Sequence, residues 1–411
     1  MNLRFRVLRN RNFLYLYVGG AVSNNGSAVS GVALTWLIYA QTQSALAVTL
    51  VGLSTIAPTI ILGLLAGAAV DRFDRKRLMI LSDLARALAV VSVPVLLVLS
   101  GFSLTWIIAV IVIVATFSTL FRPAQNAILP RIVQGEEIQD ANGVISSATT
   151  VMRTIGNAIG GILFGINLAI CFIYDGLTYL FSASTIASIK LLPSDGQPSD
   201  EVLPHSLRSD VYQGLNYIIK RAALASCTFG ATSVNFFSTL TTTFVVIYVS
   251  NQLGGNSTVY GIFLALMSAG AACGALLVGR LNAVRYAGKA MAASFLIFSA
   301  ASLILAIERN ILLSYSMAIV LGGCLSWANT IFYSALQLAV PNEVLGRVFS
   351  VDEVISYACV PVAQIAGGLI IQFVGVSVDF LIAGLGLLAS TLLLLGVRDF
   401  RRFACIPSAS I

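Results

Sequence analysis

Four ionisable side chains stand inside long apolar segments, where a bilayer makes charge costly and therefore functional by default. Arg153 and Asp175 fall at similar depths in two consecutive segments that form a hairpin. We expect them to pair or to share a polar network, and a pair would be either permanent or one that opens when Asp175 takes a proton. Asp352 and Glu353 lie early in another segment, where they either complement a helix N-terminus or bind a proton or a cationic substrate. Asp379, at the start of the last segment, is expected to cap its helix.

A second group of charges fills a short turn between the apolar runs 48–70 and 78–99. Basic residues gather at the cytoplasmic ends of membrane helices, which places this turn inside the cell. Asp83 and Arg86 follow at i, i+3 spacing on one helix face, near the cytoplasmic surface, and we expect them to join the turn in a gate. The residues of the turn that form the motif are Gly67, Asp71, Arg72, Arg75 and Lys76.

The elements that position these residues are membrane helices. The chain has 411 residues, of which 58% are hydrophobic and 10% charged, whereas globular domains are about 45–50% apolar. Apolar runs of about 20 residues each match a bilayer-spanning helix. The net charge of +7 is explained by cytoplasmic Lys and Arg and does not require nucleic acid as a partner. Twelve spans are predicted: 13–40, 48–70, 78–99, 104–121, 143–165, 168–189, 222–249, 258–279, 288–307, 311–338, 346–373 and 377–397.

A polar break divides these spans into two sets of six. The predicted organisation is an N-terminal six-helix bundle (1–190), a cytoplasmic linker with an amphipathic helix that could lie in the membrane plane (191–221), and a C-terminal bundle with a short tail (222–411). Nearly all Lys and Arg residues outside the spans fall on one side of the membrane, which puts both termini in the cytoplasm.

Enzyme chemistry has little support in the sequence. The six cysteines show no C-x-x-C spacing, there is one histidine, and no GxxxxGK[ST] loop occurs. We therefore expect no metal, no cofactor and no ATP-driven motor.

The turn motif resembles the loop between helices 2 and 3 of the major facilitator superfamily, with Asp74 in place of the usual second glycine. Further segments at 121–124, 127–130, 141–143 and 346–349 are similar to the drug and macrolide-efflux and enterobactin-exporter branch. The resemblance implies an all-α integral membrane fold of twelve helices in two pseudo-symmetric six-helix bundles. It also implies that Asp71 docks against the start of span 11 and holds the outward-facing state together.

The fifth span resembles the antiporter motif of drug exporters, Gly-Pro-x-x-Gly-Gly. Here Gly156, Asn157, Gly160 and Gly161 take these places, with Asn157 at the proline position. The alternative is simple packing of small residues against another helix. The intramembrane arginine usual on span 4 of the superfamily is missing, since Arg122 falls at the predicted cytoplasmic end of that span.

Spans 1, 4, 7 and 10 line the cavity in the superfamily, and amides and aromatic residues occur in each of them here. Such a lining suits a bulky amphipathic compound, although single Ser and Thr residues more often bond to their own helix backbone. The cavity candidates are Asn24, Asn25, Thr116, Asn235, Phe236, Trp327, Asn329, Tyr333 and Gln337.

The sequence therefore predicts a monomeric exporter of amphipathic drugs or hydrophobic natural products in the inner or plasma membrane, coupled to protons and working by a rocker switch. The alternative on the same scaffold is an importer or a facilitator of siderophores, lipids or metabolites.

Overall fold

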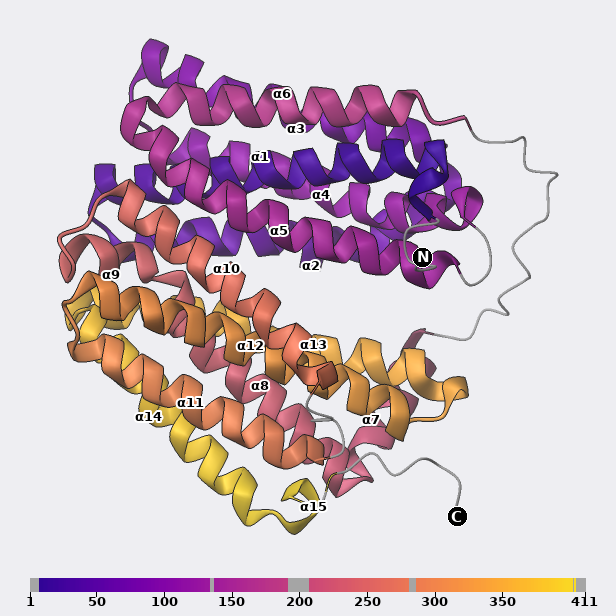
Figure 1. Cartoon of the computed structure of the whole chain (residues 1–411), viewed down its shortest axis with the longest axis vertical. Helices are drawn as coiled ribbons and strands as arrows, with labels where there is room; N and C mark the ends of the chain where they lie inside the picture. Colours follow the sequence, from indigo (N-terminus) through magenta and orange to yellow (C-terminus); the bar gives the residue numbers. More distant parts are fainter. Residues whose placement is uncertain (1–6, 134–136, 191–206, 281–285, 402, 404–411) are drawn as a thin grey trace. The chain divides into compact units, whose positions relative to one another are not determined.

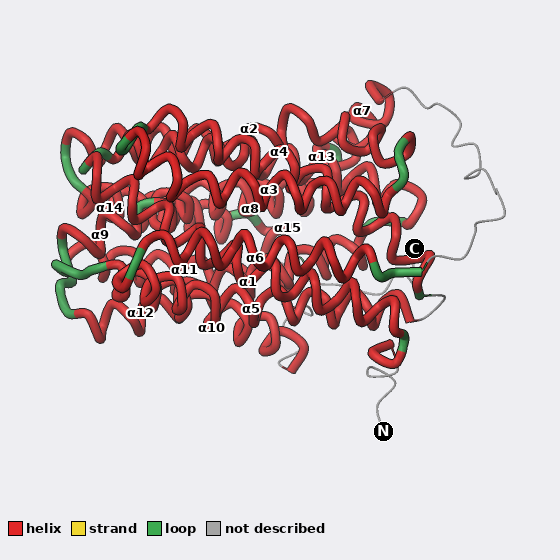
Figure 2. The backbone as a smooth tube through the Cα atoms, turned by 90° about the horizontal axis from the view of Figure 1, so that it is seen from above, coloured by secondary structure: helices red, strands yellow, loops and turns green. Residues whose placement is uncertain are grey.

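The computed structural model describes residues 7–133, 137–190, 207–280, 286–401 and 403. All regular secondary structure in these ranges is helical, and the loops lie at the ends of the helices (Figure 2). The chain forms two compact units: Met1–Pro193 with Val249–Ser268, and Ser194–Tyr248 with Ala269–Ile411.

The first unit begins with a 3-10 turn and six long helices (Figure 1). Several of them start at a polar N-cap; the side chain of Asn10, for example, accepts hydrogen bonds from the backbone of Asn12 and Phe13. The elements are η2 (Val7–Arg9), α1 (Arg11–Thr42), α2 (Ala45–Arg72), α3 (Arg75–Ser100), α4 (Leu104–Ile132), α5 (Glu137–Ile166) and α6 (Leu168–Ala187). Helix α1 packs on α5 and α6, and α3 packs on α4 and α6.

The second unit repeats this pairing. Helix α8 packs on α13 and α14, and α11 packs on α12 and α14. Helix α10 is shared, since its residues up to Ser268 belong to the first unit. The elements are α7 (Leu207–Ile219), α8 (Ala222–Thr243), α9 (Val245–Asn251), α10 (Ser257–Arg280), α11 (Ala287–Ile307), α12 (Ile311–Ala339), α13 (Asn342–Phe373), α14 (Val376–Gly396) and α15 (Arg398–Arg401).

Ten helical segments within the described ranges are long and apolar enough to cross a membrane. Helices α1 and α5 have the length but are not among the ten. Both are interrupted by amides, hydroxyls and glycines. The twelve-span arrangement therefore remains a prediction.

One helix–helix joint occurs in both units. Asn25 of α1 donates a hydrogen bond to the Met152 carbonyl of α5 at 2.8 Å. Asn235 of α8 donates to the Ser356 carbonyl of α13 at 2.9 Å. The two asparagines stand at corresponding places in the first helix of each predicted half, which supports the internal repeat.

Helix α7 packs against α13 in the second unit. The Arg347 side chain donates a 2.6 Å hydrogen bond to Gln213, and a Cβ on Gly214 would lie 2.7 Å from the Arg347 carbonyl. One face of this predicted amphipathic helix therefore contacts protein.

Candidate functional site

A buried ion pair lies inside the first unit. Asp83 and Arg86 of α3 form it, and their exposed fractions are 0% and 6%. The Arg86 guanidinium lies 4.5 Å from the ring centroids of both Phe121 of α4 and Tyr179 of α6. Aromatic faces attract a cation in this arrangement. Aromatic rings therefore enclose this pair, and its predicted position near the cytoplasmic surface stays a prediction.

Asp175 of α6 belongs to the same polar cluster. It is fully buried and accepts a 2.5 Å hydrogen bond from the Ser30 hydroxyl of α1. The charges of Arg86 and Asp83 both act on it. The Tyr179 hydroxyl lies 2.9 Å from the Ser27 hydroxyl of α1.

We call Asp83, Arg86, Asp175 and Tyr179 the acid–arginine cluster. Helices α3 and α6 supply it, and hydroxyls of α1 tie it to a third helix. Sequence reasoning missed Tyr179, although it stands at i+4 from Asp175 on one helix face. Close packing of α1 on α6 brings the parts together: a Cβ on Gly26 would lie 2.7 Å from Asp175 Oδ1.

Arg153 does not pair with Asp175 in the described part of the chain, so that prediction is wrong. Its side chain is exposed, and the charged group that acts on it is another cation, Arg122. Asp175 turns toward α1 and α3, and the similar depth of the two positions stays a prediction. A depth estimate fixes the height of a residue along a helix and does not fix its direction around the axis.

The observed end of helix α4 differs from the predicted end of span 4. Helix α4 continues to Ile132, well beyond the predicted end of span 4 at residue 121. Prolines at 123 and 130 lie inside this helix. Arg122 therefore lies inside helix α4, and its position at the cytoplasmic end of the membrane span stays a prediction.

The basic residues of the turn motif bind helix ends within the first unit. Lys76 donates at 2.6 and 2.7 Å to the carbonyls of Ala187, the last residue of α6, and of Ile189, two residues beyond it. Arg75 donates to the Ala127 carbonyl of α4 at 3.0 Å. Asp74 caps α3 by accepting a 2.7 Å bond from the Arg77 backbone, which explains an acid at the usual glycine position.

Three residues of the motif carry less information. Arg72 is exposed at the end of α2. Gly67 and Asp71 lie within α2, but their side-chain surroundings are outside the described features. The predicted docking of Asp71 onto the start of span 11 therefore stays a prediction.

The glycines of α5 permit close approach of two helices. A Cβ on Gly156 would lie 2.5 Å from the Asn25 carbonyl of α1, and one on Gly160 would lie 2.8 Å from the Val29 carbonyl. Gly161 faces Gly261 in the part of α10 that belongs to the same unit. Asn157 donates to the Ser268 hydroxyl of α10 at 3.1 Å. The motif packs helices, and its asparagine adds a polar link.

The cavity candidates of the first unit divide into two kinds. Asn25 is buried, and its amide is used by the Met152 carbonyl and by the Tyr174 hydroxyl, so it joins helices and does not line a cavity. Asn24 lines a small pocket between α1, α4 and α5 that also includes Gln125 and Thr149. Thr116 is half-buried on α4.

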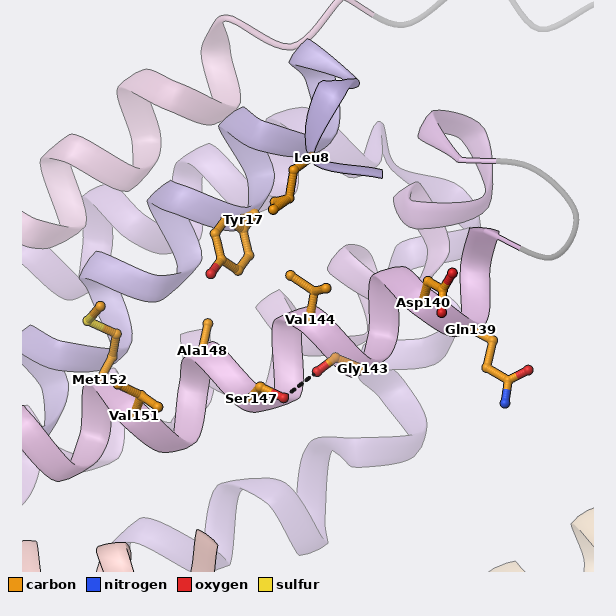
Figure 3. Close-up of a pocket in the computed structure, with 10 residues that line it drawn as sticks. All are labelled: Leu8, Tyr17, Gln139, Asp140, Gly143, Val144, Ser147, Ala148, Val151 and Met152. Carbon is orange, nitrogen blue, oxygen red and sulfur yellow. Dashed lines mark hydrogen bonds between the residues drawn. The ribbon is translucent and has the colours of Figure 1, made fainter. Parts of the chain in front are cut away.

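A larger cavity of about 680 Å³ adjoins that pocket, since both are lined by Tyr17 and Ala148. Figure 3 shows Tyr17 of α1 across from a row of α5 side chains that runs from Met152 at one end to Asp140 at the other. Its lining is mainly apolar, with Val144, Val151 and Met152 contributing. The sequence-based candidates did not include it.

The candidates of the second unit are mostly engaged with neighbouring helices. Asn235 bonds to α13, and Phe236 packs edge-on against Phe237 at 5.2 Å. Trp327 donates to the Ala290 carbonyl of α11 at 3.3 Å. Tyr333 stacks on Phe349 of α13 at 5.7 Å. The remaining two candidates, Asn329 and Gln337, are exposed on α12.

The acids of the second unit have fewer partners. Asp352 is buried and accepts a 2.6 Å bond from the Thr228 hydroxyl of α8, while Glu353 is exposed. Asp352 lies well beyond the first turn of α13, so the helix N-terminus interpretation is wrong for it. Asp379 does not cap α14, because the cap is Gly375 with no side-chain bond.

The described residues contain no group of three or more His, Cys, Asp or Glu side chains that could hold a metal ion.

Comparisons with known proteins agree with this arrangement. A family model described as transmembrane secretion effector matches residues 4–409. The multidrug efflux pump Tap of Mycolicibacterium fortuitum is 25% identical, covering 93% of this chain and 94% of Tap. Macrolide efflux protein A of Streptococcus pyogenes is 24% identical, covering 90% and 92%.

Solved structures show the same fold. A bacterial homolog of the human lysosomal transporter Spinster, in an inward-facing conformation, has a TM-score of 0.69 at 15% identity, covering 97% of both chains. A mutant of the nucleoside transporter NupG has a TM-score of 0.75 at 11% identity, covering 94% of this chain and 99% of NupG. The predicted family is confirmed: the chain belongs to the transmembrane secretion effectors of the major facilitator superfamily, which are membrane transporters and not enzymes.

Proposed function

We propose that this transporter exports amphipathic small molecules in exchange for protons, by alternating access of two six-helix halves. The relatives named as multidrug and macrolide efflux pumps support export. The observation that carries the coupling is the buried Asp175, bonded to Ser30 of α1 and acted on by Arg86.

The charge of the acid–arginine cluster gives the reason. Two carboxylates and one guanidinium leave a net charge of −1 when both acids are ionised. Burying an uncompensated charge is expensive, so the cluster is stable when it also holds one proton. Asp175 is the better acceptor, because Asp83 is already in direct contact with the guanidinium.

Protonation would act on α1 through the Ser30 hydroxyl. When ionised, Asp175 accepts the short hydrogen bond from Ser30 and holds α1 against α6. When protonated, the acid becomes a neutral partner, and a charge-assisted hydrogen bond loses about half its strength. Helix α1 also contributes Asn24 and Tyr17 to the pockets, so proton uptake and substrate binding share one helix.

Transport in everted membrane vesicles tests the proposal. With an acidified interior, the wild type should accumulate an amphipathic dye, and collapse of the pH gradient by nigericin should stop the accumulation. Asp175→Asn should abolish gradient-driven accumulation, whereas Asp399→Asn, which neutralises an exposed acid of α15, should not.

Dye accumulation that ignores both nigericin and Asp175→Asn would refute proton coupling. Accumulation only in right-side-out vesicles would favour the importer or facilitator alternative.

A further inference from the structure

Two arginines in the first unit lie inside helices and have no acidic partner. Arg122 of α4 and Arg153 of α5 are exposed. Neither forms an ion pair or a side-chain hydrogen bond within the part of the chain that the structure describes. An arginine remains charged at any physiological pH, and a charge at membrane depth marks a functional site.

The two arginines can be located relative to the small pocket between α1, α4 and α5. Gln125 and Thr149 line it. Arg122 stands three residues before Gln125, and Arg153 stands four residues after Thr149. These spacings place each arginine on the pocket side of its helix, one turn away.

Contacts with α1 show that Arg122 and Arg153 are displaced from the pocket toward the same end of α1. Along α1, Asn10 bonds to Ile132 of α4, and Gly20 lies beside Gln125, so α4 runs antiparallel to α1. Tyr17 shares a pocket with Ala148 of α5, and Asn25 bonds to Met152, so α5 runs parallel to α1. Arg122 and Arg153 are therefore both displaced toward the level of Asn24 and Asn25.

Among the described residues, no carboxylate near this level is placed to neutralise them. Asp175 is buried against α1 and bonded to Ser30. Asp140, which lines the larger cavity, precedes Arg153 by thirteen residues on α5, or roughly 20 Å along the helix. Two like charges that act on each other are best relieved by an anion between them.

We propose that Arg122 and Arg153 bind the acidic group of an amphipathic organic anion, whose apolar part lies in the cavity between α1 and α5. Guanidinium groups bind carboxylate, sulfonate or phosphate oxygens with two parallel hydrogen bonds. Asn24 and Gln125 border the site with amides, and Tyr17, Val144 and Met152 supply apolar surface. This assignment rests on the proposed export function only for its consequence, since binding itself needs no transport.

Equilibrium binding of two dyes with the same ring system tests the site. Carboxyfluorescein is anionic and rhodamine 123 is cationic, and fluorescence anisotropy measures their binding to the purified full chain in zwitterionic nanodiscs. The wild type should bind carboxyfluorescein more tightly. Arg122→Gln and Arg153→Gln should each weaken that binding about tenfold to a hundredfold, since a hydrogen bond to a charged group is lost, and should not weaken rhodamine binding.

Arg131→Gln is the matched control, because Arg131 is an exposed arginine of the same helix α4; it should leave both dyes unaffected. Arg153→Lys keeps the charge and should retain most carboxyfluorescein binding, even if a glutamine variant fails to fold.

Three results would overturn the assignment. The first is preference of the wild type for rhodamine 123, and the second is unchanged carboxyfluorescein binding in both glutamine variants. The third is loss of carboxyfluorescein binding in nanodiscs that contain phosphatidylglycerol, which would assign the site to a lipid headgroup. Binding without export would contradict the proposed function alone, whereas export of cations without anion binding would contradict only this assignment.

Discussion

The two units bury their acids in different ways. In the first unit, Asp83 and Asp175 share Arg86, two aromatic rings and hydroxyls of α1. In the second unit, Asp352 has the Thr228 hydroxyl, and neither carboxylate oxygen of Asp379 has a hydrogen-bond partner among the described residues. Yet both units keep the asparagine joint between equivalent helices. Both units pack equivalent helices through an asparagine, while among the described residues the buried arginine is found in the first unit.

Replacing Arg86 should cause the largest loss of stability and should affect the first unit. Arg86→Met leaves two buried carboxylates without a cation, which costs about 3–5 kcal/mol for a broken buried pair. Thermal unfolding of the purified protein measures the loss. Arg77→Met, at an exposed arginine of the same helix, is the control. Equal stability of the two variants would mean that the cluster is already neutral without Arg86.

The second largest difference in stability between the units is expected for glycine-to-alanine substitutions in α5 and α13. Gly156→Ala places a Cβ 2.5 Å from a backbone carbonyl of α1, which cannot move alone. Gly367→Ala meets the side chains of Leu240 on α8 and of Phe244, the residue directly after that helix, and both can turn away. We expect about 1–3 kcal/mol of destabilisation for Gly156→Ala and less for Gly367→Ala, measured by thermal unfolding.

Gly143→Ala is the reference for the glycine variants, because a Cβ there meets open space; it should stabilise α5 slightly. If Gly367→Ala costs more than Gly156→Ala, the backbone contact in α5 is not the tighter of the two.

Substitution of the asparagine in either joint should lower the stability of the protein by a similar amount. Asn25→Ala and Asn235→Ala each leave a carbonyl of the neighbouring helix without its donor, at about 1–3 kcal/mol. Asn24→Ala removes only a bond to its own helix backbone and should cost less. Unequal losses at Asn25 and Asn235 would show that the joints are not equivalent.

Replacing Asp379 should cause the smallest loss of stability. Its buried carboxylate has no hydrogen bond to lose within the described chain, so Asp379→Asn should leave the unfolding temperature unchanged or raise it. The same substitution at Asp352 weakens the bond from Thr228, because a neutral amide oxygen replaces the carboxylate as its acceptor, and should lower the unfolding temperature. A large loss at Asp379 would point to a partner supplied during transport.

The sequence predicted the helices, the family and three residues of the acid–arginine cluster, but it missed Tyr179 and paired Asp175 with Arg153. Hydropathy and motif spacing report depth and helix face, so Asp83, Arg86 and Asp175 were recognised as buried or gating residues. Which helix Asp175 faces depends on the packing of α1 against α6 at Gly26, and no single-chain pattern encodes that rotation. Helix α4 continues through two prolines beyond the predicted end of span 4, because an apolar run alone does not show where a helix ends.

Asn25 and Asn235 illustrate a second limit. A polar residue in a span predicts either a cavity or a helix joint, and only the position of the partner carbonyl decides between them. Here the carbonyls of Met152 and Ser356 make both residues joints. Asn24, one position away from Asn25, lines the pocket instead.

Proton release on substrate binding tests proton coupling through Asp175 most directly. The purified protein in weakly buffered solution is mixed with its substrate, and a pH-indicator dye records the protons released. The account predicts release by the wild type and by Asp399→Asn, and none by Asp175→Asn that still binds substrate. Equal release by Asp175→Asn would contradict it, since the proton would then reside elsewhere.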